Sequence, residues 1–171
     1  MLDISIDYYV VVNMAGVKEI VNALGGVNIV SPLTFSYEGH EFIKGDISHM
    51  DEDRALAFAR MRYEDLDGDY GRQKRQRMVI EGILDKATSS SMLSNYQGVL
   101  AALSNNVQTN FPVSEFLSMQ SSGYLAATKN IKLLQMVGAS RMGSDGIWYH
   151  FVPDEDLLHM QALLQTELEM D

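Results

Sequence analysis

The opening of the chain alternates between strand-like and helix-like sequence, and this order restricts the fold more than any other feature. Residues 6–12 are rich in β-branched and aromatic side chains, which is typical of a buried strand. Apolar residues recur at helical spacing over residues 17–24, and Gly25-Gly26 predicts the end of that helix because glycine readily adopts the left-handed conformation. Residues 27–30 predict a second strand. A β-α-β opening favours helices packed on a sheet, so we expect an α/β fold with three α-β-α layers and a mixed central sheet.

The rest of the chain predicts further helices and strands but contains no domain linker. Residues 35–50 should form a loop or a short hairpin, and residues 63–71 an acidic loop. The remaining elements are expected helices over 51–58, 72–86, 92–103 and 114–127, and expected strands over 131–137 and 148–152 joined by a loop over 138–146. Asp154 should cap a last helix whose apolar face is Leu157, Leu158, Leu163, Leu164 and Leu168. We therefore expect a single domain over residues 1–171.

The charge and residue composition argue against several functions. The formal net charge is −10, which opposes binding to nucleic acid backbones. The chain has no cysteine, so a cysteine nucleophile, a disulfide and a thiolate metal site are excluded. The four histidines lack the paired spacing of metal ligands, and no residue of the chain is predicted to bind a metal. No run of about 18 apolar residues occurs, so the sequence predicts no membrane-spanning helix.

Arginine is concentrated in one short part of this acidic chain. Six of the seven arginines lie within the 24 residues from Arg54 to Arg77. Arg60 and Arg62 are two residues apart, so in an extended segment their side chains point the same way while Met61 points to the opposite face. So many like charges in so short a segment must repel one another unless an anion or carboxylates lie among them.

A helix beginning near Arg72 supplies the second half of this arginine cluster. Helical spacing places Arg72, Arg75 and Gln76 on one face, followed by Val79 and Ile83. The apolar end of that face should dock on the core, so the polar first turn should also face the protein. Free N–H groups at a helix start favour an anion, and arginine forks bind phosphate oxygens in pairs. The two pairs of arginines are therefore predicted to converge on a phosphate or pyrophosphate.

The residues alone leave three alternatives to a phosphate site open. A solvated helix face could pair its arginines with Asp65, Asp67 and Asp69 of the intervening loop. A buried arginine–carboxylate network would pair the same groups inside the protein. Nucleic acid binding is the third alternative, which the net charge opposes.

The segments 54–62 and 68–77, the second being Gly-Asp-Tyr-Gly-Arg-Gln-Lys-Arg-Gln-Arg, resemble the central signature of the LytR-CpsA-Psr family. The opening segment 6–27 and the late Gly146-Ile147-Trp148-Tyr149 are also similar, so the resemblance covers nearly the whole chain. It implies a phosphotransferase that attaches polyprenyl-pyrophosphate-linked glycopolymers, such as teichoic acid or capsular polysaccharide, to peptidoglycan. It also implies Mg²⁺ as cofactor and an apolar tunnel for the lipid tail.

The resemblance assigns roles to individual residues. Arg60 and Arg62 match arginines that hold the pyrophosphate, and Arg72 and Gln76 match further head-group contacts with Arg75 alongside. Asp69 matches an aspartate that orients an arginine or assists removal of a proton. The expected catalytic residues are therefore Arg60, Arg62, Asp69 and Arg72, and the expected pyrophosphate ligands are Arg60, Arg62, Arg72, Arg75 and Gln76.

The resemblance further implies where such a protein acts and what this chain lacks. The expected location is the extracytoplasmic face of the bacterial membrane, and the expected partners are the glycolipid and peptidoglycan, with no nucleic acid. The chain matches the C-terminal two-thirds of the domain, without the membrane helix and the metal-binding segment, so we expect weak or no activity and a homodimer through an exposed sheet edge. The alternatives are an envelope-related transcriptional regulator and a non-catalytic polyprenyl-phosphate binder.

Overall fold

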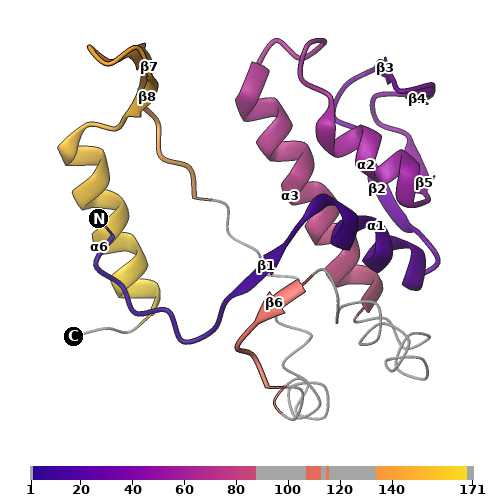
Figure 1. Cartoon of the computed structure of the whole chain (residues 1–171), viewed down its shortest axis with the longest axis horizontal. Coiled ribbons are helices and arrows are strands. Elements are labelled where there is room, and N and C mark those ends of the chain that lie inside the picture. The colour runs from indigo at the N-terminus through magenta and orange to yellow at the C-terminus, as the bar shows by residue number, and fades with distance from the viewer. Residues whose placement is uncertain (1, 88–106, 113–114, 116–133, 169–171) are drawn as a thin grey trace. The chain divides into compact units, whose positions relative to one another are not determined.

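The computed structural model describes residues 2–87, 107–112, 115 and 134–168, which fall into two compact units. The larger unit comprises Tyr8–Lys129, and the smaller unit comprises Met1–Asp7 with Asn130–Asp171 (Figure 1). The expected helices over 92–103 and 114–127 lie outside the described residues, apart from Glu115. Among the described residues, no helix is both long and apolar enough to cross a membrane.

The larger unit begins with strand, helix and strand, in the predicted order. The first strand is shorter than the expected 6–12, and Val10 and Val11 are exposed, so the prediction of a buried strand is wrong. Its elements are β1 (Val10–Val12), α1 (Met14–Ala23), β2 (Val27–Val30), β3 (Phe35–Tyr37), β4 (His40–Phe42), β5 (Ile47–Met50), α2 (Glu52–Arg60), α3 (Gly68–Ala87) and β6 (Val107–Thr109). The stretch 35–50 is thus a hairpin followed by a third strand. The expected loop over 63–71 is shorter than predicted, because α3 begins at Gly68 rather than near residue 72.

Side-chain caps explain where the first two helices of the larger unit begin. Asn13 Oδ1 accepts a hydrogen bond of 2.8 Å from the Gly16 N–H at the start of α1. Asp51 Oδ1 accepts one of 2.8 Å from the Arg54 N–H at the start of α2. Each cap satisfies a backbone donor that the helix itself leaves unpaired.

An aromatic and aliphatic core holds the larger unit together. Phe35 and Phe42 stack with ring centroids 4.5 Å apart, and Phe58 of α2 lies 5.4 Å from Phe42. Helix α3 packs on β2 at Gly82, where an added Cβ would lie only 3.3 Å from Ile29 Cγ1. The apolar half of α3 therefore docks on the core as predicted, and α3 carries its first turn to the end of α2.

The smaller unit consists of a hairpin and a helix. The hairpin pairs β7 (Ala139–Met142) with β8 (Trp148–Phe151), and α6 (Asp154–Glu167) follows. The expected strand over 131–137 is wrong for residues 134–137, while 131–133 lie outside the described residues. The strand instead occupies part of the expected loop over 138–146, because the turn needs only the residues around Gly146, at φ +79°. Asp154 is the first residue of α6 rather than its cap, a position that Pro153 takes without a side-chain hydrogen bond.

The described strands pair as four separate antiparallel ladders: β1–β6, β2–β5, β3–β4 and β7–β8. The mixture of helix and strand confirms the α/β class. A single mixed central sheet is not among these ladders, so the three-layer arrangement stays a prediction.

Candidate functional site

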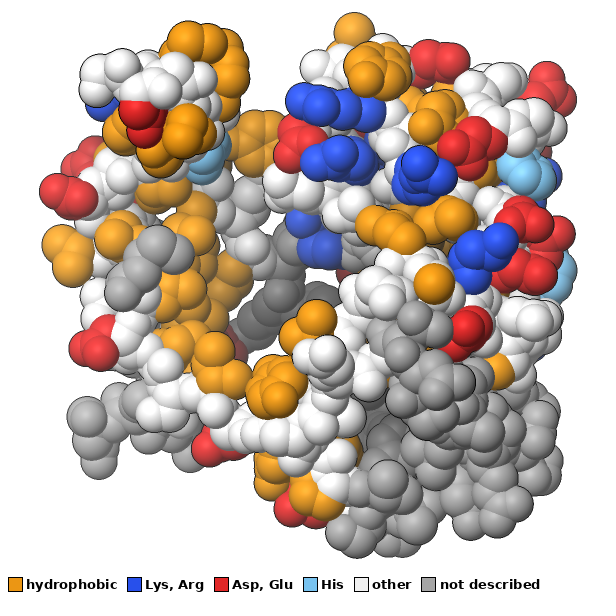
Figure 2. Space-filling view, in the orientation of Figure 1, with side chains coloured by type: hydrophobic (Ala, Val, Ile, Leu, Met, Phe, Trp, Pro, Cys, Tyr) orange, Lys and Arg blue, Asp and Glu red, His pale blue; other side chains and the backbone are white. Residues whose placement is uncertain are grey.

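The predicted site residues lie where α2 ends and α3 begins. Arg60 is the last residue of α2, and Met61 follows with extended backbone at ψ 135°. Met61 is buried, whereas the Arg60 and Arg62 side chains are about half exposed, at 50% and 55%. The expected alternation around Met61 is therefore present. Figure 2 shows Lys and Arg side chains gathered on the larger unit, with Asp and Glu side chains beside them.

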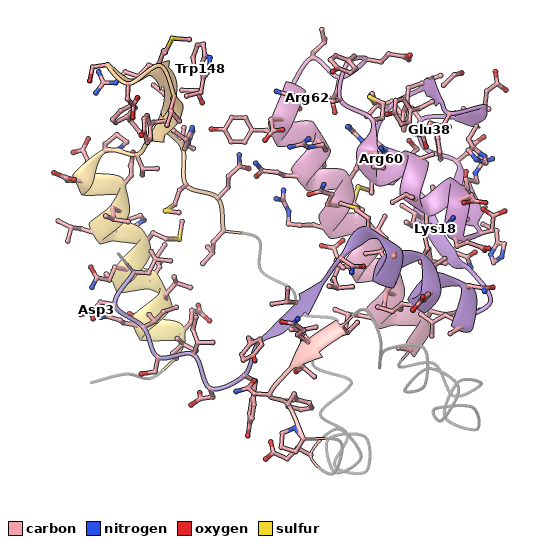
Figure 3. The ribbon with its side chains drawn as sticks, viewed as in Figure 1. Asp3, Lys18, Glu38, Arg60, Arg62 and Trp148 are labelled. Carbon is pink, nitrogen blue, oxygen red and sulfur yellow. The ribbon has the colours of Figure 1, made fainter. Side chains whose placement is uncertain are left out.

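Arg60 is paired with a residue that sequence reasoning missed. Its Nη1 lies 3.4 Å from Glu38 Oε1, and both residues are labelled in Figure 3. Glu38 occupies the tight turn between β3 and β4 with φ +48°, a left-handed backbone conformation uncommon for a residue other than glycine. The sequence Glu38-Gly39 signals a turn, but nothing local links that turn to α2.

Asp69, in the first turn of α3, brings Arg62 and Arg72 together. Its Oδ1 lies 2.5 Å from Arg72 Nη2 and 4.0 Å from Arg62 Nε. The other oxygen of Asp69 accepts a hydrogen bond of 3.1 Å from Gln73 Nε2. Two arginines, one just after α2 and one in α3, thus meet at one carboxylate. This is the pairing with nearby aspartates that the sequence left open as an alternative, and the phosphate site itself stays a prediction.

One buried donor at this meeting point is left unused. Within the part of the chain that the structure describes, Arg72 Nε is buried and has no hydrogen-bond partner. Asp69 Oδ1 is likewise buried, and it has ion pairs but no well-aligned hydrogen bond. Buried polar groups are normally satisfied, so an unused N–H beside two cations is a place for an acceptor to bind. Gln76 is half-buried one turn further along α3.

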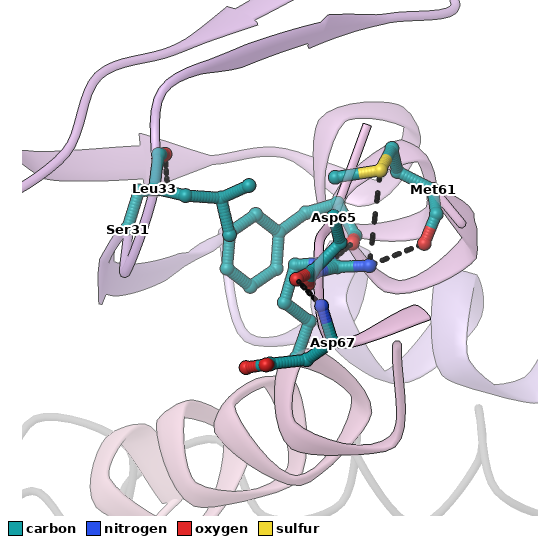
Figure 4. Close-up of polar contacts among 7 residues, drawn as sticks. Ser31, Leu33, Met61, Asp65 and Asp67 are labelled. Carbon is teal, nitrogen blue, oxygen red and sulfur yellow. Dashed lines mark hydrogen bonds and ion pairs between the residues drawn. The ribbon is translucent and has the colours of Figure 1, made fainter. Parts of the chain in front are cut away.

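Arg75 lies differently from the other arginines, because its side chain is fully buried. Its Nε donates to the Phe58 carbonyl oxygen at 3.1 Å, Nη2 donates to the Met61 carbonyl oxygen, and Nη1 pairs with Asp65 Oδ2. Figure 4 shows polar contacts around Met61, Asp65 and Asp67 in this region. The Phe58 carbonyl belongs to the last turn of α2, where no helical N–H can satisfy it, so Arg75 caps that helix from outside.

The expected role of Arg75 as a pyrophosphate ligand has no support in this arrangement. Its donors are directed inward, and none is presented where Arg62 and Arg72 meet. The buried arginine–carboxylate network, one alternative from the sequence, therefore holds at this residue. Helical spacing places Arg72 and Arg75 on one face but does not show which of them reaches the carbonyl groups of α2.

Asp65 is held on both of its oxygens. Oδ1 accepts a hydrogen bond of 3.0 Å from the Asp67 N–H, and Oδ2 pairs with Arg75. Burial alone would raise the pKa of Asp65, but the Asp67 N–H and the Arg75 guanidinium outweigh it and hold that pKa below its usual value. The carboxylate comes so close to α3 that a Cβ on Gly71 would lie 1.8 Å from Oδ2. Only glycine fits at position 71 while this pair is formed.

A metal site does not accompany the arginines in the described structure. Among the described residues, no three acidic or histidine side chains are grouped so that they could hold a metal ion. Asp65 and Asp69 already form ion pairs with arginines. The described residues therefore do not fit Mg²⁺, and dependence on this ion stays a prediction.

One hollow lies elsewhere, on the hairpin of the smaller unit. It has a volume of about 490 Å³ and is lined by Arg141, Met142, Gly143, Ser144, Asp145, Tyr149 and Phe151. None of the predicted site residues lines this hollow.

The structure packs helices on antiparallel strands and gathers paired arginines at one helix junction. These features define an α/β protein with a concentrated cationic surface. The model of the LytR_cpsA_psr family matches residues 1–166, and the chain belongs to this family. The resemblance stated from the sequence is therefore confirmed.

The curated relatives are transferases. A Bacillus cereus protein named polyisoprenyl-teichoic acid–peptidoglycan teichoic acid transferase TagU is 44% identical over 99% of this chain and 55% of its own length. An Enterococcus faecalis protein of the same name is 44% identical over 98% of this chain and 54% of its own length. The chain thus spans about half the length of the curated relatives it matches.

Solved structures support the same fold. The crystal structure of Bacillus subtilis TagU is 34% identical with a TM-score of 0.77, covering 99% of this chain and 68% of that chain. A structure from Enterococcus faecalis, described as a transcriptional regulator, is 35% identical with a TM-score of 0.85, covering 99% of this chain and 62% of that chain.

Proposed function

We propose that this chain carries the phosphate-binding site of a cell-envelope phosphotransferase. Its donor would be a polyprenyl-pyrophosphate-linked glycopolymer, such as teichoic acid or capsular polysaccharide, and its acceptor would be peptidoglycan. The observation that carries the proposal is the convergence of Arg62 and Arg72 on Asp69, beside the unused Arg72 N–H. The 44% identity with teichoic acid transferases supports the choice of substrates.

The proposed reaction transfers a phosphoryl-linked glycopolymer between two oxygens. A sugar hydroxyl of peptidoglycan attacks the phosphorus that bears the glycopolymer, and a new P–O bond forms. The bond from that phosphorus to the bridging oxygen breaks, so the lipid leaves as polyprenyl phosphate and the hydroxyl proton is released. The protein forms no covalent bond to the substrate in this reaction. It accelerates the reaction by positioning the reactants and by stabilising the charge of the transition state.

The arginines fit this task through their donor geometry. Arg62 and Arg72 approach one point from two elements, so they can bind both phosphates of a pyrophosphate with paired N–H groups. Arg60 is half exposed, as Arg62 is, and Gln76 adds an amide one turn beyond Arg72. Asp69 orients the two arginines through its ion pairs, and in this proposal it also takes up the hydroxyl proton.

Several finer expectations remain part of this proposal. The site would face the extracytoplasmic side of the bacterial membrane, where peptidoglycan is built. The three-layer α-β-α arrangement with a mixed central sheet is also part of the proposal. Dependence on Mg²⁺, low activity of this chain alone and a homodimer through a sheet edge are predictions of the same kind.

A transcriptional regulator is a second candidate, because a solved structure with a TM-score of 0.85 is described in that way. The residues argue against DNA binding. The chain has a net charge of −10, and Arg60, Arg62, Arg72 and Arg75 each have a carboxylate partner. A non-catalytic polyprenyl-phosphate binder would use the same arginines and differs only in turnover.

Release of polyprenyl phosphate from a synthetic polyprenyl-pyrophosphate disaccharide tests the proposal. Replacing Arg62 or Arg72 by alanine should lower the rate about 10²-fold or more, because each removes a charge contact to the transition state. Lys74→Ala, an exposed cation on the same helix, is the matched control and should leave the rate nearly unchanged. Release that does not depend on either arginine, or no binding of the lipid pyrophosphate at all, would contradict the proposal. Binding without release would favour the lipid binder.

A further inference from the structure

The ion pair between Arg75 and Asp65 is the one buried pair among the ion pairs of the described residues. Arg75 is fully buried and the Asp65 side chain is 9% exposed, whereas the side chains of the other pairs are 35–66% exposed. Removing one partner of a buried pair leaves an uncompensated charge, so such a pair opens far less readily than an exposed one. The proposed reaction does not use this pair directly, so its role must lie in what it holds in place.

On one side, this pair fixes the segment that carries the first two arginines. Arg75 donates to the carbonyl oxygens of Phe58 and Met61, and these two residues lie on either side of Arg60 in the chain. The Met61 carbonyl also immediately precedes Arg62. The backbone that directs both exposed arginines is therefore tied to α3 through one guanidinium.

On the other side, the same pair fixes the start of α3. Asp65 accepts from the Asp67 N–H, and Gly71 leaves just enough room for its carboxylate against the helix. Asp69 and Arg72 flank Gly71 within that first turn. One buried pair thus sets the distance between Arg60 and Arg62, at the end of α2 and just after it, and Asp69 and Arg72 of α3.

We infer that Arg75 and Asp65 are positioning residues of the phosphate site, which align Arg60, Arg62 and Arg72 without touching the substrate. This inference rests on the proposed function. It replaces the expectation that Arg75 is itself a ligand, and it adds Asp65, which the sequence left as a loop carboxylate. Lysine could not take the place of Arg75, because one ammonium cannot reach two carbonyls and a carboxylate with a fixed planar fork.

Two charge-matched variants in the same loop separate positioning from direct binding. Asp65→Asn and Asp67→Asn each remove one negative charge near the arginines, and both keep the Asp67 N–H. Coulombic attraction alone should make either variant bind inorganic pyrophosphate slightly more tightly. If Arg75 were a ligand held back by Asp65, Asp65→Asn would release it and tighten binding further. If the pair aligns the other arginines, Asp65→Asn should weaken binding about tenfold, as misplacement of binding groups does.

The measurement is titration calorimetry of the chain and both variants with inorganic pyrophosphate. Weaker binding by Asp65→Asn, with equal or tighter binding by Asp67→Asn, supports the inference. Equal behaviour of the two variants, or tighter binding by Asp65→Asn, overturns it while leaving the phosphate site intact. No binding by the unaltered chain overturns the proposed function and the inference together.

A second measurement on the unaltered chain keeps the inference testable if Asp65→Asn does not fold. NMR resonances of the arginine Nε–H groups are followed as pyrophosphate is added. Those of Arg62 and Arg72 should shift, while the Arg75 resonance should stay in place and remain protected from exchange with water. An Arg75 resonance that shifts as far as that of Arg62 shows direct contact and overturns the inference.

Discussion

Gly71→Ala should destabilise the larger unit, although alanine is the better helix former. Gly71 lies in the first turn of α3, and an added Cβ would meet Asp65 Oδ2 at 1.8 Å and Asp65 Cγ at 2.3 Å. Those separations are far inside van der Waals contact, so the carboxylate must move. Asp65 cannot move while it remains bonded to both Arg75 and the Asp67 N–H.

The expected loss follows from two opposing effects. Separating a buried arginine from its carboxylate costs about 3–5 kcal/mol, because the guanidinium stays buried and unpaired. Exchanging glycine for alanine inside a helix gains about 1 kcal/mol. The net loss in the free energy of unfolding is therefore about 2–4 kcal/mol, a large part of the stability of a small domain.

Denaturant unfolding followed by far-UV circular dichroism measures this loss. Trp148 is the only tryptophan and lies in β8 of the smaller unit, so its fluorescence reports a part of the chain that the substitution does not touch. Gly82→Ala is the control, because Gly82 is buried on the same helix and its Cβ would meet Ile29 Cγ1 at 3.3 Å, a tight contact that Ile29 can relieve with a much smaller shift than Asp65 would need. If Gly71→Ala proves as stable as Gly82→Ala, the close approach of Asp65 to α3 is wrong.

The remaining predictions concern acid stability and a helix cap. The pKa of Asp65 is lowered in the folded chain, so its stabilising contribution is complete above its unfolded pKa and is lost as the pH falls through the folded one. The difference in unfolding free energy between the unaltered chain and Asp65→Asn should thus be constant near neutral pH and should disappear below about pH 4. Urea titrations at a series of pH values measure this difference. A difference that stays constant at all pH values would refute the prediction. Asp51→Ala removes the cap of α2 and should cost about 1 kcal/mol, whereas Asp51→Asn, which keeps an acceptor, should cost much less in the same assay.

Much of the arginine site could be predicted because its signals are local. The spacing of Arg72, Val79 and Ile83 indicates which face of α3 packs on the protein. The alternation at Arg60 and Arg62 indicates the end of α2. What could not be predicted depends on tertiary packing. Glu38 reaches Arg60 only because the β3–β4 hairpin folds against α2.

Much of the fold could also be predicted, because its signals are local in the sequence. Strand β2 and helices α1 and α2 were expected nearly where they lie, because apolar periodicity marks elements with one buried face. Strand β7 was missed because its sequence Ala-Ser-Arg-Met lacks the β-branched and aromatic residues that are typical of a strand. Strand β8 is equally exposed but was predicted, because it is rich in aromatic residues. The early start of α3 at Gly68 depends on Asp65 accepting from the Asp67 N–H, a turn contact that hydrophobic periodicity does not reveal.

The difference in burial between the ion pairs explains how one junction can both bind an anion and keep its shape. Exposed ion pairs contribute about 0–1 kcal/mol, so Arg60 and Arg62 can exchange Glu38 and Asp69 for phosphate oxygens at little cost. A pair buried like Arg75 and Asp65 costs several kcal/mol to separate, so it stays closed while its neighbours exchange partners. In the proposed site, an incoming pyrophosphate would therefore replace the carboxylates at the surface. The buried guanidinium would keep its carbonyl contacts and hold the backbone of both exposed arginines in place.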